Sequence, residues 1–462
     1  MSTLAFDSDL LRRYDKPGPR YTSYPAAPQF NSSFDATAMR QQIARSNGDL
    51  IPRHLSLYLH IPYCSSPCFY CGCNRLITRD PGKGEVYLQR LLREIEQMAP
   101  LFDRDREVVQ LHLGGGTPNF LGPAQLRVLM QSLQRQFRLS TRRERDFSIE
   151  LDPRFVTPQD VAQLAALGFN RASLGIQDFD AGVQQAVNRF QGVAQTRAVI
   201  DACREHGMAS INVDLIYGLP RQTLRGFGGT LDTVIAAAPQ RLAVYGYAHM
   251  PHLFRAQQQI AAADLPAAEA KLALLQLAVE KLGAAGYRHI GMDHFALPLD
   301  ELARAQAKGS LQRNFMGYTT HADTDLLGLG VSAISRIADA YWQNPRALRD
   351  WESAVDAGRP ALWRGLALTS DDLLREDAIQ QLMCQGVIDI AALESRHAIV
   401  FAEYFADALQ QLQPLQRDGL VICDKARITA TPRGRLLLRV IAMCFDAYLQ
   451  LPSAQPRFSR VI

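Results

Sequence analysis

Short β-prone runs alternate with amphipathic helical runs from about residue 55 to residue 247 of this 462-residue chain. The helical runs carry apolar residues at three- and four-residue intervals, the periodicity of a helix with one buried face. Strands separated by helices of this length predict βαβ units and a parallel sheet, and six such units predict an α/β fold with an incomplete TIM-like (β/α)6 barrel. The predicted strands are Leu55–Ile61, Val108–Leu113, Phe147–Leu151, Arg171–Ile176, Ile211–Ile216 and Arg241–Tyr247. The predicted helices are Val86–Met98, Gln125–Phe137, Pro158–Leu167, Ala194–His206 and Leu224–Ala237.

The segments on either side of this alternation predict two further domains. The N-terminal segment contains a turn-rich stretch at residues 17–25, too irregular for a barrel element. The C-terminal segment changes to helices with two short strands. The predicted domains are 1–50, an N-terminal arm over the barrel mouth; 51–368, the barrel and its extension; and 369–462, a mainly helical, winged-helix-like C-terminal domain.

Beyond the sixth strand, the sequence predicts two more elements before the C-terminal domain. Leu265–Ala285 predicts a long helix, and Asp323–Gly330 predicts a glycine-containing turn that lines a site. In the C-terminal domain, three helices precede short strands at Gly419–Cys423 and Arg427–Thr431 and a last helix at Arg435–Tyr448. Many winged-helix modules bind DNA, but this last helix is mostly apolar, so we interpret the domain as a lid or packing module.

Composition excludes several classes of protein. Hydrophobic residues make up 47% of the chain and charged residues 21%, which is ordinary for a globular protein. No apolar run is long enough for a transmembrane helix, so no membrane insertion is expected. The formal net charge of +4 is too small to argue for nucleic-acid binding. The first residues are polar and predict no signal peptide, so we expect a cytoplasmic protein, and nothing indicates an assembly larger than a monomer.

Four cysteines fall between residues 64 and 73, and the first three are spaced C-x3-C-x2-C. Iron–sulfur clusters are held by cysteine thiolates, usually four when the cluster only transfers electrons. Three thiolates leave a four-iron cluster with one iron that lacks a protein ligand and is free to bind a cofactor or substrate. A zinc knuckle normally needs a second pair of ligands, and no second C-x2-C occurs. A disulfide pair is the other alternative, and a reducing compartment disfavours it.

Glycines and polar residues fall where the predicted strands end, which is where ligands bind in parallel barrels. Gly114–Thr117 follows the second strand, and such glycines let backbone amides approach a ligand, although a plain turn is the simpler interpretation. Glu150 ends the third strand and is suited to accept hydrogen bonds from ribose hydroxyls, or else caps the next helix. Gln177, Arg189 and Asp214 follow or end later strands and indicate nothing by themselves.

The cysteine spacing, with the aromatic Tyr70 before the third cysteine, resembles the signature of the radical S-adenosylmethionine (radical SAM) enzymes. The resemblance implies that SAM binds the open iron and is cleaved reductively to a 5′-deoxyadenosyl radical. Together with motifs elsewhere, the chain resembles one branch of that superfamily, the oxygen-independent coproporphyrinogen III oxidases (coproporphyrinogen dehydrogenases) of haem biosynthesis. The motifs that carry this resemblance are Arg20–Pro25, Cys64–Cys73, Gly114–Pro118, Ser148–Glu150, Asp214–Pro220, Tyr247–His249, Gly291–Phe295 and Gly317–Thr320.

The resemblance implies a role for each matching residue. The ligands of a [4Fe-4S] cluster would be Cys64, Cys68 and Cys71, with Cys73 close by but outside the cluster. The residues implied in catalysis are Tyr58, Glu150 and Cys73. One SAM, on the open iron, would contact Tyr58, Gly115 and Glu150. A second SAM would contact Tyr70, Gly116, Thr117, Gln177, Arg189, Asp214, Ala248 and Ile334.

The implied substrate is coproporphyrinogen III, whose two reacting propionates lose carbon dioxide and become vinyl groups, giving protoporphyrinogen IX. An unidentified low-potential electron donor is the implied partner. A tetracarboxylate needs cationic contacts, so we expect Arg20 and Arg313 to bind propionates, beside Phe315 and Met316. The chain departs from the family pattern at Tyr70, where phenylalanine is usual, and at Met316, where glutamine is usual.

Two other classes of function stay open at this point. One is a porphyrin-binding relative that resembles the haem chaperones and has no decarboxylase activity. The N-terminal arm and Cys73 distinguish the oxidase branch from those relatives. The other is a zinc-binding regulator that uses the C-terminal module, for which metal analysis would find zinc without iron or sulfide.

Overall fold

The computed structural model describes residues 4–321, 323–450 and 458–461. The chain packs as two compact units. The barrel unit comprises Phe30–Ala267 and Asp323–Ala367, and the terminal unit comprises Met1–Gln29, Ala268–Ala322 and Leu368–Ile462. The packing therefore groups residues 268–322 with both ends of the chain. The three-domain division expected from the sequence, including an arm over the barrel mouth, stays a prediction.

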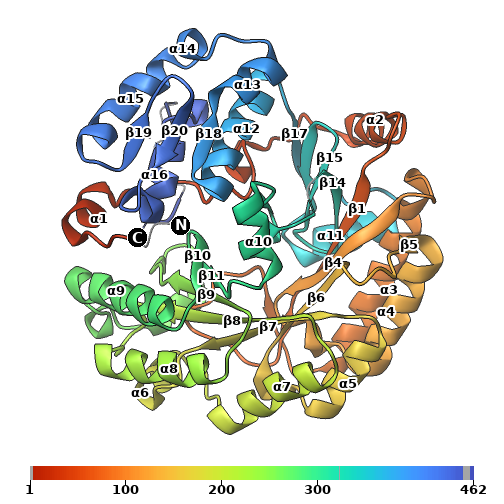
Figure 1. Cartoon of the computed structure of the whole chain (residues 1–462). Helices are drawn as coiled ribbons and strands as arrows, with labels where there is room; N and C mark the ends of the chain where they lie inside the picture. The colour runs from red at the N-terminus through yellow and green to blue at the C-terminus, as the bar shows by residue number, and fades with distance from the viewer. Residues whose placement is uncertain (1–3, 322, 451–457, 462) are drawn as a thin grey trace. The chain divides into compact units, whose positions relative to one another are not determined.

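The six predicted strands are all present in the barrel unit and lie side by side in one sheet (Figure 1). Every neighbouring pair among them is parallel. Their apolar side chains are almost fully buried, as is typical of parallel strands covered by helices. In spatial order the strands are β9 (Arg241–Gly246), β8 (Ser210–Tyr217), β7 (Arg171–Gln177), β6 (Asp146–Leu151), β4 (Glu107–Gly115) and β1 (His54–Ile61).

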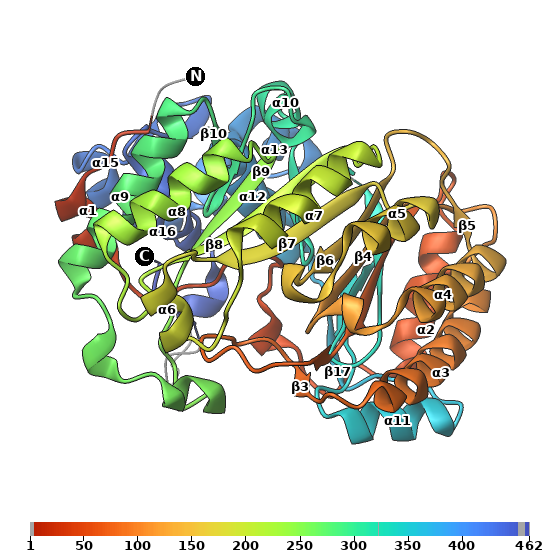
Figure 2. The same ribbon diagram turned by 90° about the horizontal axis from the view of Figure 1, so that it is seen from below.

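Helices run along the outside of this sheet, and Figure 2 shows α4, α5 and α7 on the outer side of β4, β6 and β7. The starts of these helices follow from local sequence. Thr157 caps α5 in a reciprocal capping box with Asp160, and a proline occupies its first turn. The helices of the barrel unit are α2 (Ala36–Asn47), α3 (Pro81–Met98), α4 (Pro123–Gln136), α5 (Pro158–Ala166), α6 (Ala181–Ala186), α7 (Val193–Glu205), α8 (Leu224–Ala236) and α11 (Leu348–Asp356).

The sheet continues past the predicted barrel strands on the far side of β1, and here one prediction is wrong. Asp323–Gly330 is not a turn, because β14 (Thr324–Leu329) pairs in parallel with β1 and is almost wholly buried. The glycine at position 328 suggested a turn, but it is needed inside a strand. A Cβ there would lie 2.5 Å from the Ile334 carbonyl oxygen. Beyond β14 the strands are antiparallel: β15 (Ile334–Ile337), β16 (Ala340–Gln343) and β17 (Arg364–Ala367).

The terminal unit contains the predicted helices and the short strand pair. Its core joins α12 to the later helices and to Tyr21 and Tyr24 from the N-terminal segment. A third strand, β18, adds to the predicted pair in the order β18-β20-β19. Its main elements are α1 (Ser8–Tyr14), α9 (Ala268–Ala284), β10 (Arg288–Gly291), β11 (His294–Ala296), α10 (Glu301–Lys308), β12 (Gln312–Asn314), β13 (Gly317–Thr319), α12 (Ser370–Gln385), β18 (Val387–Asp389), α13 (Ile390–His397), α14 (Phe401–Tyr404), α15 (Ala406–Arg417), β19 (Val421–Cys423), β20 (Arg427–Ala430) and α16 (Leu438–Met443).

The last helix is shorter than the predicted Arg435–Tyr448, because α16 ends at Met443. Asp446 supplies the reason. Its carboxylate accepts a hydrogen bond from the Tyr21 hydroxyl at 2.9 Å and another from the Tyr448 backbone amide at 2.9 Å. Local side-chain bonds of this kind compete with helical hydrogen bonding. Among the helices that the structure describes, none is both long and apolar enough to span a bilayer.

Candidate functional site

The cysteine loop leaves the carboxyl end of β1, at the edge of the barrel where the sequence predicts ligands. Cys64 ends the short strand β2 (Tyr63–Cys64), which pairs in parallel with β3 (Leu76–Ile77) and closes the loop at its base. All four cysteines are free thiols. The Thr117 hydroxyl donates to the Cys64 sulfur at 3.2 Å, and the Cys73 backbone amide donates to the Cys71 sulfur at 3.4 Å.

The local environment shifts the pKa values of two thiols of this loop in opposite directions. A hydrogen bond from Cys73 holds the pKa of Cys71 below its usual value, which favours the thiolate form that binds metals. Burial raises the pKa of the Cys64 thiol to about 11, so this sulfur is protonated near neutral pH until it gains a metal partner. In the described part of the chain, no group of three or more His, Cys, Asp or Glu side chains is close enough to hold a single metal ion.

The glycine loop is tied to the cysteine loop through the backbone. The Gly116 amide donates to the Ile61 carbonyl at 2.8 Å, and the Thr117 amide donates to the Tyr63 carbonyl at 2.9 Å. Glycine is required at two of these positions. Gly115 has a φ of +117°, and a Cβ on Gly116 would lie 2.6 Å from the Pro62 carbonyl oxygen. The two loops therefore form one rigid edge.

Glu150 lies at the end of β6 with its carboxylate bound to this edge. Its Oε2 accepts a hydrogen bond from the Gly115 amide at 3.1 Å, and its Oε1 lies 3.3 Å from His112 Nε2. Burial works against ionisation, but the bonds with His112 and Gly115 lower the pKa of Glu150 below its usual value. The group is therefore a fixed carboxylate at neutral pH.

Tyr58 lies on β1 beside this carboxylate, and its ring stacks on His112 with centroids 5.9 Å apart. His60 Nε2 lies 2.9 Å from the Asn74 carbonyl oxygen, so that nitrogen carries the proton. The other ring nitrogen, Nδ1, then accepts the hydrogen bond from the Tyr58 hydroxyl at 3.0 Å. Burial lowers the pKa of His60, which keeps the ring neutral in this chain of hydrogen bonds.

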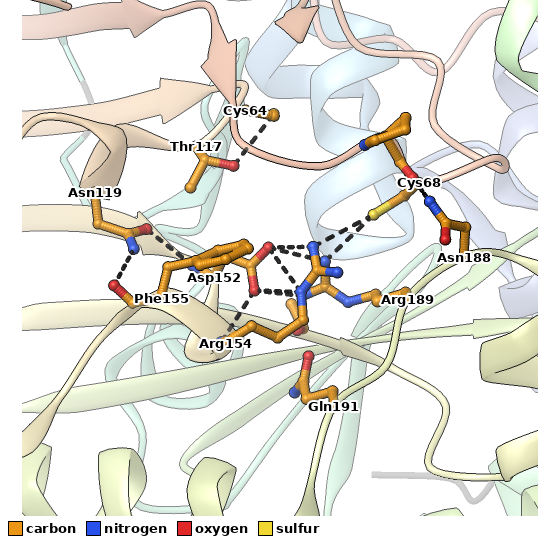
Figure 3. Close-up of polar contacts among 12 residues, drawn as sticks. Cys64, Cys68, Thr117, Asn119, Asp152, Arg154, Phe155, Asn188, Arg189 and Gln191 are labelled. Atoms are coloured by element: carbon orange, nitrogen blue, oxygen red, sulfur yellow. Dashed lines mark hydrogen bonds and ion pairs between the residues drawn. The ribbon is translucent and has the colours of Figure 1, made fainter. Parts of the chain in front are cut away.

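An ion-paired group that the sequence interpretation only partly anticipated lies across from Cys68 (Figure 3). Asp152 follows β6 and binds two arginines, Arg154 and Arg189. Both guanidinium groups also lie 3.6 Å from the Cys68 sulfur. Arg189 is a predicted site residue, whereas Arg154 was missed. Arg154 could have been found from its position just after the carboxyl end of the third predicted strand, because ligands of parallel barrels bind at these strand ends.

Of the residues expected to contact a second SAM, Gly116 and Thr117 belong to the glycine loop, and the others lie in two further places. Gln177 and Arg189 lie together against Gly175, where Arg189 Nη2 donates to the Gly175 carbonyl at 2.5 Å. Gln177 has a φ of +69°, and its buried Oε1 has no hydrogen-bond partner. A strained backbone with an unsatisfied buried oxygen is typical of functional positions. Asp214, one strand further on, accepts from Asn212 at 2.8 Å, and burial raises its pKa to about 6.

The other group joins Tyr70 to Ala248 through a residue that sequence reasoning missed. The buried side-chain amide of Gln257 donates to the Tyr70 carbonyl at 2.9 Å and to the Ala248 carbonyl at 3.2 Å. Ile334 begins β15, and its carbonyl lies against Gly328, the residue that pairs with Tyr58 across β1 and β14. Gln257 has no motif around it, so no sequence pattern would have identified it.

The predicted substrate residues all belong to the terminal unit. The Arg20 guanidinium forms an ion pair with Asp293. Arg313 lies on β12 with its guanidinium 4.9 Å from the Tyr318 ring, and its buried Nε and Nη1 have no hydrogen-bond partner. Phe315 and Met316 form the two-residue turn between β12 and β13, and the Met316 amide donates to the Asn314 side chain at 2.8 Å.

The donor set fits a [4Fe-4S] cluster with three cysteine ligands. Cys64, Cys68 and Cys71 come from one short loop, and their sulfurs receive hydrogen bonds from Thr117, the arginines and a backbone amide. Hydrogen bonds to thiolate sulfurs are a general feature of iron–sulfur sites. The Gly115, Gly116 and Thr117 amides already donate within the site, so the Glu150 carboxylate is the group suited to bind an amino group or a ribose.

Comparison with known proteins agrees with this geometry. The model of the radical SAM superfamily matches residues 58–234, and the model of the HemN C-terminal domain matches residues 368–437. The oxygen-independent coproporphyrinogen III oxidase of Pseudomonas aeruginosa is 49% identical over 462 residues, which is 100% of both chains. The enzyme of the same description from Helicobacter pylori (strain ATCC 700392 / 26695) is 38% identical, also over 100% of both chains.

A solved structure extends the similarity to the whole fold. The coproporphyrinogen III oxidase HemN from Escherichia coli, a radical SAM enzyme, superposes with a TM-score of 0.92 at 47% identity. The match covers 97% of this chain and 100% of that one. Identity at this level over the full length, with the cysteine and glycine loops both present, makes this chain a member of the oxygen-independent coproporphyrinogen III oxidase family of radical SAM enzymes.

Proposed function

We propose that this chain decarboxylates two propionate side chains of coproporphyrinogen III oxidatively and so produces protoporphyrinogen IX. The observation that carries the proposal is the rigid edge formed by the three-cysteine loop and the glycine loop, with the Glu150 carboxylate bound to it. When bound, the cluster and SAM would supply a 5′-deoxyadenosyl radical for abstraction of a hydrogen atom from a propionate β-carbon; loss of carbon dioxide and transfer of one electron to an acceptor would then leave the vinyl group.

The chain's own residues hold and orient SAM in this proposal. Glu150 is fixed by Gly115 and His112, so its remaining lone pairs are available to ribose hydroxyls or an amino group without reorganisation. Tyr58 is held by its hydrogen bond to His60 and presents its ring beside the same carboxylate. Such prior alignment reduces the entropy lost when the reactants are brought together.

A second SAM is supported by a separate set of polar positions. Gln177 has an unsatisfied buried oxygen, and Asp214 is a carboxyl group whose pKa is raised to about 6. On the other side, Gln257 fixes the backbone at Tyr70 and Ala248. Two SAM molecules, the low-potential electron donor, a monomeric state and a cytoplasmic location all belong to this proposal and stay predictions.

Arg313 is the best-supported contact for a substrate carboxylate. The residue is 6% exposed, and two of its guanidinium nitrogens have no hydrogen-bond partner. A buried cation with unsatisfied donors is costly, so an anionic ligand would stabilise it. Arg20 already pairs with Asp293, so it would have to exchange or share that partner to bind a propionate.

Arg313→Ala tests this contact. A charge-assisted hydrogen bond contributes about 1.5–3 kcal/mol, so we expect KM for coproporphyrinogen III to rise roughly 10- to 150-fold. Arg304→Ala removes an exposed arginine of the same unit and is the control. Unchanged KM in the Arg313 variant would exclude the contact. Met316→Gln restores the residue usual in the family, and a change in decarboxylation rate would show that this turn position faces the substrate.

The activity itself is tested by anaerobic reconstitution with iron, sulfide and a reductant. We expect release of 5′-deoxyadenosine from SAM and conversion of coproporphyrinogen III to protoporphyrinogen IX, with Cys64→Ala as the inactive control. Tight haem binding without SAM cleavage would instead support the haem-chaperone-like alternative. Zinc without iron or sulfide would contradict both.

A further inference from the structure

Two buried guanidinium groups face the sulfur of Cys68, whereas the positive charge near Cys71 and Cys64 comes from Arg75. Arg154 Nη2 and Arg189 Nη1 each lie 3.6 Å from its sulfur (Figure 3). Arg75 donates to the backbone carbonyl of the same cysteine at 2.9 Å. The side chains of Arg154 and Arg189 are only 10% and 7% exposed, so both cations are held in a region of low dielectric.

Asp152 holds the two guanidinium groups in this position. It binds Arg154 through Nε at 2.9 Å and Nη2 at 2.7 Å, a two-nitrogen fork that fixes the plane of the guanidinium. It also accepts from Arg189 at 3.1 and 3.3 Å. The Asp152 backbone is itself fixed, since its amide donates to the Asn119 side chain at 3.0 Å. The group of three side chains carries a net charge of +1.

Ion pairing alone does not explain why two arginines share one carboxylate here. Asp152 would be satisfied by one arginine, and a single pair would be neutral. The second arginine leaves one positive charge uncompensated beside the sulfur of a cluster ligand. Hydrogen bonds to cluster sulfurs and nearby charges are among the factors that set the reduction potential of iron–sulfur clusters.

We propose that Arg154 is a positioning residue. Together with Asp152, it holds the positive charge of two guanidinium groups beside the Cys68 sulfur and thereby favours the reduced state of the cluster. The inference rests on the proposed function, because it assumes that Cys68 binds the cluster. Reduction adds one electron, from dithionite in a titration, and so adds one negative charge to the cluster and its thiolates. Arginine cations at this distance stabilise that state more than the oxidised one.

The test is the midpoint potential of the reconstituted cluster, measured by anaerobic redox titration with electron paramagnetic resonance as the readout. At an effective dielectric constant of about 20, removal of one charge roughly 10 Å from the added electron changes the reduction equilibrium about tenfold. For a one-electron couple that corresponds to about 59 mV, so we expect Arg154→Gln to lower the midpoint potential by at least that amount.

Three further variants make the result specific. Arg154→Lys keeps the charge, so its shift should be less than half as large, although lysine lacks the fork geometry. Asp152→Asn keeps an acceptor oxygen for the arginines but removes the negative charge, so it should shift the potential in the opposite direction. Arg171→Gln is the matched control, because Arg171 is a buried arginine beside Asp146 at the amino end of the neighbouring strand β7.

The inference is overturned if Arg154→Gln shifts the potential no more than Arg171→Gln, or if Asp152→Asn shifts it in the same direction as Arg154→Gln. If Arg154→Gln does not retain iron and sulfide, the other two variants decide. The inference then requires that Asp152→Asn raises the midpoint potential and that Arg154→Lys does not raise it. Failure of the proposed function would be recognised separately, because the wild-type chain would then bind no cluster or would bind one without cleaving SAM.

Discussion

Gly116→Ala is the substitution whose effect the structure defines most sharply. A Cβ at this position would lie 2.6 Å from the Pro62 carbonyl oxygen and 2.9 Å from that of Tyr63. Both are backbone atoms, so no side chain is able to turn away. Ordinary contact begins at 3.4 Å, and the glycine loop and the cysteine loop must therefore separate by roughly 0.8 Å.

The cost follows from what that separation strains. Overpacking against a rigid backbone costs about 1–3 kcal/mol. The hydrogen bonds from the Gly116 amide to Ile61 at 2.8 Å and from the Thr117 amide to Tyr63 at 2.9 Å would weaken, at up to about 1 kcal/mol each. We expect a loss of roughly 2–5 kcal/mol in the free energy of unfolding, together with displacement of Thr117 from the Cys64 sulfur.

The measurements are urea unfolding and the iron and sulfide content after anaerobic reconstitution. Gly229→Ala is the control, because a Cβ in the middle of α8 meets nothing within 4 Å. Alanine should raise helix stability there by about 0.5–1 kcal/mol. If Gly116→Ala unfolded like the wild type and retained a full cluster, the two loops would not be rigidly coupled and the argument would be refuted.

Other perturbations test the buried charges of the barrel unit. Burial raises the pKa of Glu94 to about 7, so stability should be greatest below the unfolded pKa near 4.5 and fall by on the order of 3 kcal/mol as pH rises to and through 7. About 2 kcal/mol of this fall lies between pH 5.5 and 8, and urea unfolding of Glu94→Gln at those two pH values should lack it. Asp325 pairs with Arg106 at 2.6 Å, and both side chains are at most 1% exposed, so Asp325→Ala should cost about 3–5 kcal/mol in thermal or urea unfolding. Asp356→Ala, which breaks a half-exposed pair, should cost less than about 1 kcal/mol and serves as its comparison. Loss of under 1 kcal/mol in Asp325→Ala would contradict the assignment of a buried pair.

The six barrel strands and the helices between them were predictable because their stabilising interactions are periodic along the chain. A strand buried on both faces appears as a continuous apolar run, and a helix with one buried face repeats every three or four residues. The cysteine spacing, the glycine loop after the second strand and Glu150 at the end of the third were readable for a related reason. Parallel strands bring their carboxyl ends to one edge, so position along the strand implies proximity in space.

The strands on the far side of β1 were not predictable in the same way. The segment around Gly328 contains glycines that usually indicate a turn, yet the glycine is there because the Ile334 carbonyl passes too close for a side chain. Its pairing partner, β1, lies more than 250 residues away in the sequence. No local pattern encodes a pairing partner at that separation, so β14 was not predicted from the sequence.

The sequence alone determined the class of fold, the three-cysteine loop and the family to which the chain belongs. Tertiary structure decided which charges face which sulfurs, which residues fix the backbone around Tyr70, and which segments pack as one unit. The physical reason is that motifs record contacts made through the backbone or through near neighbours. The meeting of Asp152, Arg154 and Arg189 at Cys68 depends on three loops that only the folded sheet brings together.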